Sequence, residues 1–297
     1  MTLTIIMLLP LIGAAVIAAI PSAQTTLVKQ VALVTSVVVA VATIVKSLNF
    51  NVDQTALQFR QSYSWIPSFA INWALGVDGI ALVLILMSVI LAPVVILAGW
   101  HESEGGRWGV KTFYILILVL ETMMIGVFAA TDLFLFYVFF EAMLIPVYFL
   151  IGGYGSGERA AAAVKFLLYS LFGGLLMLAS IIGLYVISGN NGGHTFDITA
   201  LSELHTSMSS TTQNILFLGF FIAFAIKAPL WPFHTWLPDA AKSATAGSSV
   251  LLLGVLDKVG TYGMIRFCLS IFPDASKTFT PVIIVLSLIS ILYGAFL

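Results

Sequence analysis

The chain has 297 residues, of which 60% are hydrophobic and only 8% are charged, and its mean hydropathy is +1.10. An ordinary soluble domain is about 45–50% apolar and about 25% charged, so this chain has too few polar side chains to cover a soluble surface. Twelve basic and thirteen acidic residues give a net charge of −1, which excludes the basic surface that nucleic-acid binding requires. The single cysteine, Cys268, excludes an internal disulfide. The composition therefore indicates an integral membrane protein.

Nine apolar stretches are long enough to cross a bilayer as helices, which takes roughly 20 mostly apolar residues. Their residues do not alternate between apolar and polar, as those of membrane β-strands do. The stretches are approximately 3–20, 28–46, 76–99, 110–129, 132–152, 164–188, 213–237, 247–270 and 279–297. The sequence thus predicts an all-α, polytopic bundle of about nine transmembrane helices.

The connections between the stretches predict loops and an orientation. The two longest, 47–75 and 189–212, are rich in Asn, Ser, Thr and Gly. No Lys or Arg precedes the first stretch, which favours a retained transmembrane helix over a signal peptide. Connections after odd-numbered stretches hold six basic residues, and the opposite side holds four. The six are Lys29, Arg107, Lys111, Arg159, Lys165 and Lys242, and the four are Lys46, Arg60, Arg266 and Lys277. This bias places the N-terminus outside the cytoplasm.

Several ionisable side chains lie within the apolar stretches, where a charge costs about 2.5–3.5 kcal/mol on insertion scales. They are Glu121 in the fourth stretch, Glu141 in the fifth, Lys165 near the start of the sixth, Lys227 and His234 in the seventh, and Asp257 and Lys258 in the eighth. We expect these groups to face one another or water rather than lipid. Two interpretations remain open. They are buried ion pairs that only fix helix packing, or they form a proton relay built from acids and bases that influence one another.

The seventh stretch also contains Pro229, Pro232 and Pro238 within KAPLWPFHTWLPDA. Each proline removes a backbone donor and crowds the carbonyl four residues earlier, which predicts a broken helix beside Lys227. Pro146, five residues after Glu141, predicts a weaker break. Such breaks either shape helix packing or line a wet cavity. The spacing of His, Cys, Asp and Glu predicts no metal site, and no glycine-rich phosphate loop is present.

Asp257 and Lys258 are consecutive, so their side chains point roughly 100° apart on a helix. We expect Lys258 to face the pathway together with Gly254, four residues earlier. Asp257 should then face a neighbouring helix or a partner subunit as a local counter-charge.

Four segments, FYVFFEAMLIPVYFLIGGYG, RAAAAVKFLLYS, AIKAPLWPFHTWLPDA and GVLDKVGTYGMIRF, closely resemble the antiporter-like membrane subunits of respiratory complex I, the NADH-quinone oxidoreductase. The form FEAMLIP is similar to the subunit M, or mitochondrial subunit 4, type. The resemblance covers residues 70–297 and is most specific over 130–270. It implies a proton-translocating subunit of a redox enzyme, with Glu141, Lys227 and Lys258 matching the family's relay residues. Accessory candidates are Lys165, His234, Asp257 and Glu121.

The resemblance also implies an organisation and a set of partners. Residues 1–110 would form the first three helices, 111–270 the first antiporter-like repeat, and 271–297 the start of a second, truncated repeat. This chain would bind no cofactor, because NADH, FMN, iron–sulfur clusters and quinone belong to other subunits. Its partners would be other membrane-arm subunits, including other antiporter-like ones, and lipid, but no nucleic acid. The location would be the bacterial cytoplasmic membrane.

The chain departs from the family's pattern in two ways. Ala241 and Lys242 follow LPDA where many relatives have a histidine, and a family proline is missing from 244–246. Relatives also have more helices, so we expect a fragment of a longer subunit. Two other assemblies fit the same motifs, namely a multi-component cation/proton antiporter and a membrane-bound hydrogenase. A structural membrane scaffold is a further alternative, and it predicts full activity after removal of the Glu141 charge.

Overall fold

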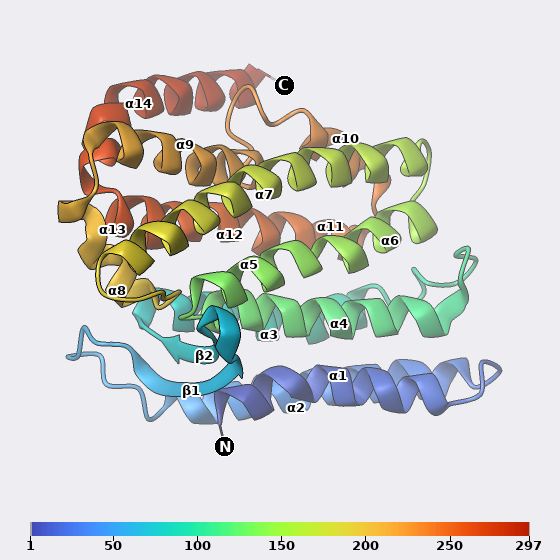
Figure 1. The fold of residues 1–297 in the computed structure, drawn as a ribbon. Coiled ribbons are helices and arrows are strands. Elements are labelled where there is room, and N and C mark those ends of the chain that lie inside the picture. The colour runs from blue at the N-terminus through green and yellow to red at the C-terminus, as the bar shows by residue number, and fades with distance from the viewer. Residues whose placement is uncertain (1, 297) are drawn as a thin grey trace.

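The computed structural model describes residues 2–296, and within that range eight helices are long and apolar enough to span a membrane. A further apolar helix, α1 (Leu3–Ala19), has 17 residues. The eight spans are Thr25–Ser47 (α2), Gly79–Ala98 (α3), Gly109–Ala129 (α4), Leu133–Tyr154 (α5 and α6), Arg159–Asn190 (α7), Ser210–Lys227 (α9), Ala246–Ile271 (α11 to α13) and Pro273–Phe296 (α14). Together with α1 they match the nine predicted stretches in order (Figure 1), so the predicted helical bundle is confirmed.

The outer surface of the helices is apolar. Val34, Val83 and Leu168, from three different helices, are each 60–64% exposed. A soluble protein rarely exposes a continuous apolar surface of this kind, whereas lipid tails solvate it well and require only that backbone polar groups bond within the helices. The chain is a multi-pass integral membrane protein.

The predicted loop 47–75 is wrong from Gln58 onward, because that segment forms an antiparallel hairpin. Strands β1 (Gln58–Ile66) and β2 (Ile71–Val77) pair with Tyr63 opposite Trp73. A 3₁₀ turn, η1 (Pro67–Phe69), joins them, and Ala70 closes the turn with a positive φ of 55°. Polar residues spread along β1 resemble a loop, because strand pairing is not visible in local composition. The third helix accordingly begins at Gly79, not at residue 76.

The fifth predicted helix is broken where Pro146 requires it. Helix α5 (Leu133–Ala142) ends one residue after Glu141, and α6 (Leu144–Tyr154) continues beyond Met143. Because the proline ring crowds the carbonyl four residues earlier, the disturbance falls at Ala142. The predicted break beside Glu141 is thus present.

The seventh predicted helix is also broken, as its prolines indicate. Helix α9 ends at Lys227, an irregular segment covers residues 228–235, and α10 (Trp236–Ser243) follows. The second long connection, 189–212, is only partly a loop, since it contains α8 (Ile198–Glu203) and the 3₁₀ turn η2 (Leu204–Ser207).

The eighth helix is continuous but changes its winding twice. It runs as α11 (Ala246–Leu251), the π-helical η3 (Leu252–Leu256), α12 (Asp257–Gly263), the π-helical η4 (Met264–Cys268) and α13 (Leu269–Ile271). Single π turns inside helices occur frequently at functional sites. Asp257 and Lys258 directly follow the first of them.

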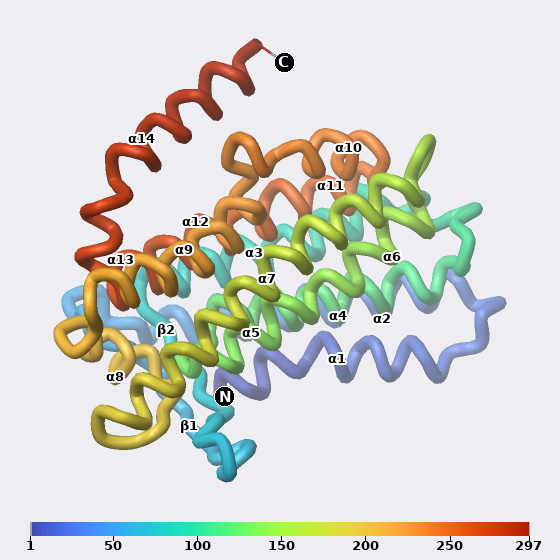
Figure 2. Tube along the Cα trace, turned by 45° about the horizontal axis from the view of Figure 1, so that its top comes forward, coloured from blue at the N-terminus to red at the C-terminus, as the bar shows by residue number. Residues whose placement is uncertain are grey.

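The two ends of the helical bundle differ in structure. The hairpin end contains the hairpin, residues 130–132 and α8, and the loop end contains the connections 20–24, 99–108, 155–158 and 244–245 (Figure 1). The six basic residues predicted for one side lie at the loop end, and the four predicted for the other lie at the hairpin end. Helix α14 diverges from the remaining helices (Figure 2).

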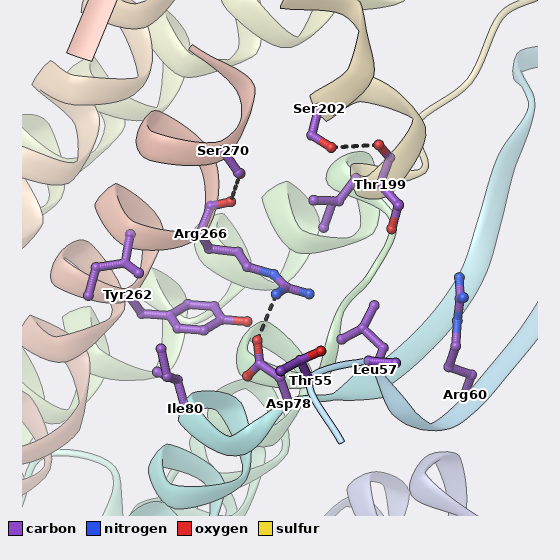
Figure 3. Close-up of a pocket in the computed structure, with 13 residues that line it drawn as sticks. Thr55, Leu57, Arg60, Asp78, Ile80, Thr199, Ser202, Tyr262, Arg266 and Ser270 are labelled. Carbon is purple, nitrogen blue, oxygen red and sulfur yellow. Dashed lines mark hydrogen bonds and ion pairs between the residues drawn. The ribbon is translucent and has the colours of Figure 1, made fainter. Parts of the chain in front are cut away.

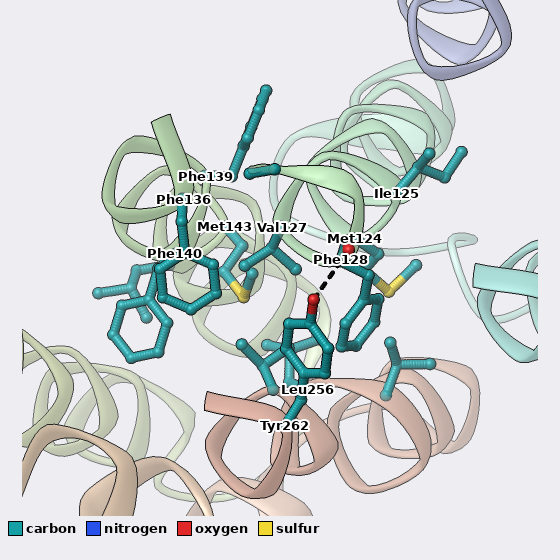
Figure 4. Packing of buried hydrophobic residues seen from close by; sticks show 14 of the residues in the cluster. Met124, Ile125, Val127, Phe128, Phe136, Phe139, Phe140, Met143, Leu256 and Tyr262 are labelled. Atoms are coloured by element: carbon teal, nitrogen blue, oxygen red, sulfur yellow. Dashed lines mark hydrogen bonds between the residues drawn. The ribbon is translucent and has the colours of Figure 1, made fainter. Parts of the chain in front are cut away.

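Aromatic side chains fill the centre between α4, α5, α9 and the eighth helix. Phe136 packs on Phe267 with ring centroids 4.4 Å apart, and Phe224 stacks on Phe267 at 5.9 Å. Figure 4 shows Tyr262 directed at the end of α4, where its hydroxyl donates to the Phe128 carbonyl oxygen at 3.1 Å. This packing fixes the eighth helix against α4, α5 and α9.

Asp132 joins the hairpin to α5 and gives the first prediction. Its buried carboxylate accepts hydrogen bonds from the Phe134 and Leu135 amides at 2.9 and 3.0 Å and from the Asn72 amide at 2.9 Å. Asp132→Ala should lower the free energy of unfolding by about 2 kcal/mol or more, because it removes an N-cap and leaves a strand amide unpaired. Thermal unfolding of the purified chain in detergent measures the loss. Asp132→Asn, which keeps one acceptor oxygen, should lose less, and equal stability of all three proteins would contradict the assignment.

Candidate functional site

Lys227 is the last residue of α9, and its position follows from the prolines that end the helix. Its side chain is 1% exposed, and within residues 2–296 its Nζ has no hydrogen-bond partner. Nζ lies 5.0 Å from the centroid of the Phe140 ring and 5.5 Å from that of Phe166. Ring faces attract a cation but accept no proton from it. Lys227 is therefore a buried amine held by aromatic rings without a fixed ion-pair partner.

Backbone carbonyls near the helix break after Lys227 find hydrogen-bond donors close by. The Leu230 amide donates to the Ala225 carbonyl at 2.8 Å, and the indole Nε1 of Trp236 donates to the Ile226 carbonyl at 2.8 Å. A carbonyl freed at this depth would otherwise cost free energy. The Trp236 side chain thus ties the start of α10 to the last turn of α9, next to Lys227.

Glu141 occupies the matching position on the other broken helix. Its carboxyl lies over Gly174 of α7, where even a Cβ would overlap it. Its Oε1 is buried and finds no hydrogen-bond partner in the described chain. Glu141 and Lys227 influence each other electrostatically, yet no ion pair within 4.0 Å joins them among the residues that the structure describes. The breaks bring together an acid and a base that do not neutralise each other directly.

The side chains of Asp257 and Lys258, on the eighth helix, differ in their exposure. Lys258 is exposed on the surface of the described chain, on the side where Gly254 meets Leu91 of α3. Asp257 is partly buried, and its Oδ1 has no hydrogen-bond partner within residues 2–296. Gly260, three residues after Asp257 and on the same side of α12, packs on the Phe224 carbonyl and the Ala228 amide, so Asp257 faces the turn of α9 that ends at Lys227. That Lys258 faces the pathway while Asp257 faces a neighbouring helix or a partner subunit stays a prediction: Lys258 is exposed, and Asp257 lies on the side of α12 that packs on α9.

Glu121, Lys165 and His234 lie apart from this group. Glu121 is fully buried between α2 and α4 and accepts a hydrogen bond from the Ser36 hydroxyl at 2.8 Å. Lys165 pairs with Asp239 of α10 at 2.7 Å. His234 stands in the irregular segment after Lys227, with its ring 4.7 Å from that of Tyr293. We find no direct contact between these three residues and the Glu141–Lys227 group within the described range.

Several charged side chains at the ends of the bundle form ion pairs, in contrast to Glu141 and Lys227 in its centre. At the hairpin end, Arg266 donates to Asp78 at 2.7 Å beside a cavity of about 400 Å³, shown in Figure 3. At the loop end, Lys29 donates to Glu104 at 2.6 Å, and this bond, with a second from His101, lowers the pKa of the Glu104 carboxyl. Ion pairs thus form where water is near, whereas the buried acid and base stay apart. Stability alone would favour the reverse, because an unpaired buried charge is the more costly one.

Sequence reasoning missed three features of the site. They are Gly174 beneath the Glu141 carboxyl, the rings of Phe140 and Phe166 around Lys227, and the pairing of Asp239 with Lys165. Only Asp239 carried a usable signal, because an acidic residue so near a broken apolar helix needs a partner.

Comparisons with known proteins agree with this architecture. The sequence model of the family described as "NADH:quinone oxidoreductase/Mrp antiporter, TM" matches residues 130–297. NADH-quinone oxidoreductase subunit M of Mycobacterium tuberculosis (strain ATCC 25618 / H37Rv) is 44% identical, over 99% of this chain and 59% of the relative. The chain thus spans little more than half of that relative's length.

Two solved structures share the fold. A chain of respiratory complex I from Thermus thermophilus with bound NADH superposes with a TM-score of 0.85 at 29% identity, over 99% of this chain and 58% of that one. A chain of the Mrp complex from Dietzia sp. DQ12-45-1b superposes with a TM-score of 0.77 at 21% identity, over 91% of this chain and 29% of that one. The second likeness concerns the fold alone.

The hydrogen bond from Trp236 to Ile226 should stabilise the helix break. Trp236→Phe keeps the ring contact with Phe166 but leaves the Ile226 carbonyl unpaired. We expect a loss of about 1–3 kcal/mol, measured as a lower midpoint of thermal unfolding in detergent. Trp231→Phe is the matched control, because the Trp231 indole makes no hydrogen bond within the described residues. Equal midpoints for both variants would show that the break does not depend on this bond.

Proposed function

Because the chain belongs to the NADH:quinone oxidoreductase/Mrp antiporter family of membrane proteins, we propose that it is a proton-translocating membrane-arm subunit of an NADH:quinone oxidoreductase, the complex I type. The observation that carries this proposal is the unpaired, buried Lys227, which lies at a helix break beside the equally unpaired Glu141. Charged groups kept at this depth without direct neutralisation are typical of proton pathways.

The proposed chemistry is proton transfer between buried groups. A change in the separation of Glu141 and Lys227 changes the free energy of holding a proton on Lys227. The break in each helix supplies a point where such a change can occur with little cost to the rest of the bundle. Lys258, on the eighth helix, would receive the charge next and carry it toward the exposed side of α12. Proton transfer would occur within the repeat 111–270.

The redox reaction takes place elsewhere in this proposal. NADH, FMN, iron–sulfur clusters and quinone would be bound by partner subunits, and the other membrane-arm subunits would be the partners of this chain. The membrane would be the bacterial cytoplasmic membrane. The six basic residues at the loop end, against four at the hairpin end, support a cytoplasmic loop end and an N-terminus outside the cytoplasm.

Two alternatives share the fold, a subunit of a multi-component cation/proton antiporter and a membrane-bound hydrogenase. Likeness of fold does not separate them, because function depends on the assembly as well as on the site. The 44% identity to a relative named subunit M favours complex I. Mass spectrometry of the native assembly decides the matter, since co-purified NADH-binding and quinone-binding subunits support the proposal and sodium–proton antiporter subunits contradict it.

Charge removal at Glu141 and Lys227 tests the relay. Glu141→Ala should lower NADH-driven proton uptake about tenfold or more, and Glu141→Asp should retain part of it, because its charge persists on a shorter side chain. Lys227→Arg should also pump poorly, because arginine stays protonated and cannot release its charge. Proton uptake by vesicles containing the purified complex, normalised to assembled complex, is the measurement. Full uptake by Glu141→Ala would favour a structural scaffold, and full uptake by Lys227→Arg would show that a fixed charge is enough.

Gly174 offers a test that leaves every charge in place. A methyl group there overlaps the Glu141 carboxyl, so Gly174→Ala should displace the carboxyl and reduce proton uptake severalfold while the complex still assembles. Gly152→Ala is the matched control, since its methyl group would meet only the Ala163 Cβ at 3.4 Å. Equal uptake by the two variants would mean that the position of Glu141 over α7 does not matter for transfer.

A further inference from the structure

Asp257 lies on the side of α12 that faces Lys227. Gly260, three residues later, packs so closely on α9 that a Cβ there would overlap the Phe224 carbonyl and the Ala228 amide. Residues three apart share one face of a helix, so Asp257 points toward the same final turn of α9, which ends at Lys227. Lys258, about 100° further around the helix, lies on the exposed surface of the described chain.

Asp257 and Lys227 also share the lack of a hydrogen-bond partner for a buried polar atom. Within the described residues, neither Asp257 Oδ1 nor Lys227 Nζ has a hydrogen-bond partner, and both atoms are buried. The Phe140 ring, next to Glu141 in the chain, lies 5.0 Å from Lys227 Nζ, and Gly260, on the side of α12 that carries Asp257, packs on the last turn of α9. Lys227 therefore stands between an acid on α5 and an acid on α12.

We propose that Asp257 is a second counter-carboxylate of Lys227, so that one buried amine is shared between Glu141 and Asp257. This inference rests on the proposed proton relay and adds a member to it. Lys227 then has two alternative partners on two different helices, and the charge can follow whichever carboxylate is nearer.

The arrangement gives a balanced proton-transfer step. Transfer of one proton from the Lys227 ammonium to the Asp257 carboxylate breaks an N–H bond and forms an O–H bond. It leaves a neutral amine and a neutral carboxylic acid, so the net charge of the pair is zero before and after. Asp257 is the neighbour of Lys258 in the chain, and it thereby links the α9 amine to the eighth helix, whose Lys258 does not itself reach Lys227.

The simpler interpretation gives Asp257 to Lys258 as a local counter-charge. In that case Asp257 would act independently of Glu141. If the two carboxylates share Lys227, their effects depend on each other, because each becomes more important when the other is displaced.

A double-mutant cycle separates these interpretations. We compare NADH-driven proton uptake by vesicles containing the purified complex with Asp257→Asn, Glu141→Asp, both changes, or Lys227→Ala, normalised to assembled complex on native gels. The combined loss for Asp257→Asn with Glu141→Asp should exceed the product of the single losses by about threefold or more. Asp257→Glu should restore most of the uptake. Thr261→Val, an exposed position one turn later on the same helix, is the matched control and should pump normally.

Each outcome decides the matter. This inference would be overturned if the loss of proton uptake in the double variant equalled the product of the two single losses. Normal uptake by Asp257→Asn, with impaired uptake by Lys227→Ala, would also overturn it. Either outcome would leave the proposed relay intact. Normal uptake by Lys227→Ala would overturn both. If Asp257→Asn fails to assemble, Asp257→Ser takes its place in the cycle, because its smaller side chain adds no bulk and removes the same charge.

Discussion

The structure depends on one costly condition, a lysine ammonium or amine buried within a membrane span without a fixed acceptor. Burying a single charge costs several kcal/mol even after relaxation, and a direct ion pair would recover much of it. Lys227 instead rests between the rings of Phe140 and Phe166, and its carboxylate neighbours stand on other helices. A site optimised for stability would close these gaps. A site that must gain and lose a proton needs them open, because a tight ion pair holds its proton in one place.

Helix breaks allow this condition to persist. An intact α-helix uses every backbone group internally, so a residue in its middle is fixed by the whole helix. Lys227 and Glu141 each stand at the end of a helical piece, where a small change of direction moves the side chain. At the first break the Ile226 carbonyl accepts a hydrogen bond from the Trp236 indole. At the second break the helical bond from the Met143 amide to the Phe139 carbonyl is kept, so the turn that carries Glu141 stays helical up to the break.

The sequence was sufficient for the helical architecture and for part of the site. Apolar length located every span, and the proline positions located both breaks, because each of these signals acts locally. The hairpin was missed because polar residues spread along 58–66 make this strand resemble a loop in composition. The roles of Asp257 and Lys258 were uncertain for a different reason. Helical periodicity gives the angle between two neighbours, but only tertiary contacts, here Gly260 on α9 and Gly254 on α3, say which neighbour faces which helix.

The eighth helix is held by hydrogen bonds near both ends and changes its winding between them. At the loop end, where the family's histidine and proline are absent, Glu102 accepts from the Gly247 amide at 3.0 Å and Thr245 caps the first turn. At the hairpin end, Arg266 is tied to Asp78, which itself caps α3. The π turn Leu252–Leu256 lies between these anchors, and the second π turn, Met264–Cys268, contains Arg266 itself. Asp257 and Lys258 directly follow the first π turn, so its wider winding sets the angle at which their side chains leave the helix. The winding at Leu252–Leu256 and the contact of Gly260 with α9 together determine which of the two charged side chains faces the last turn of α9.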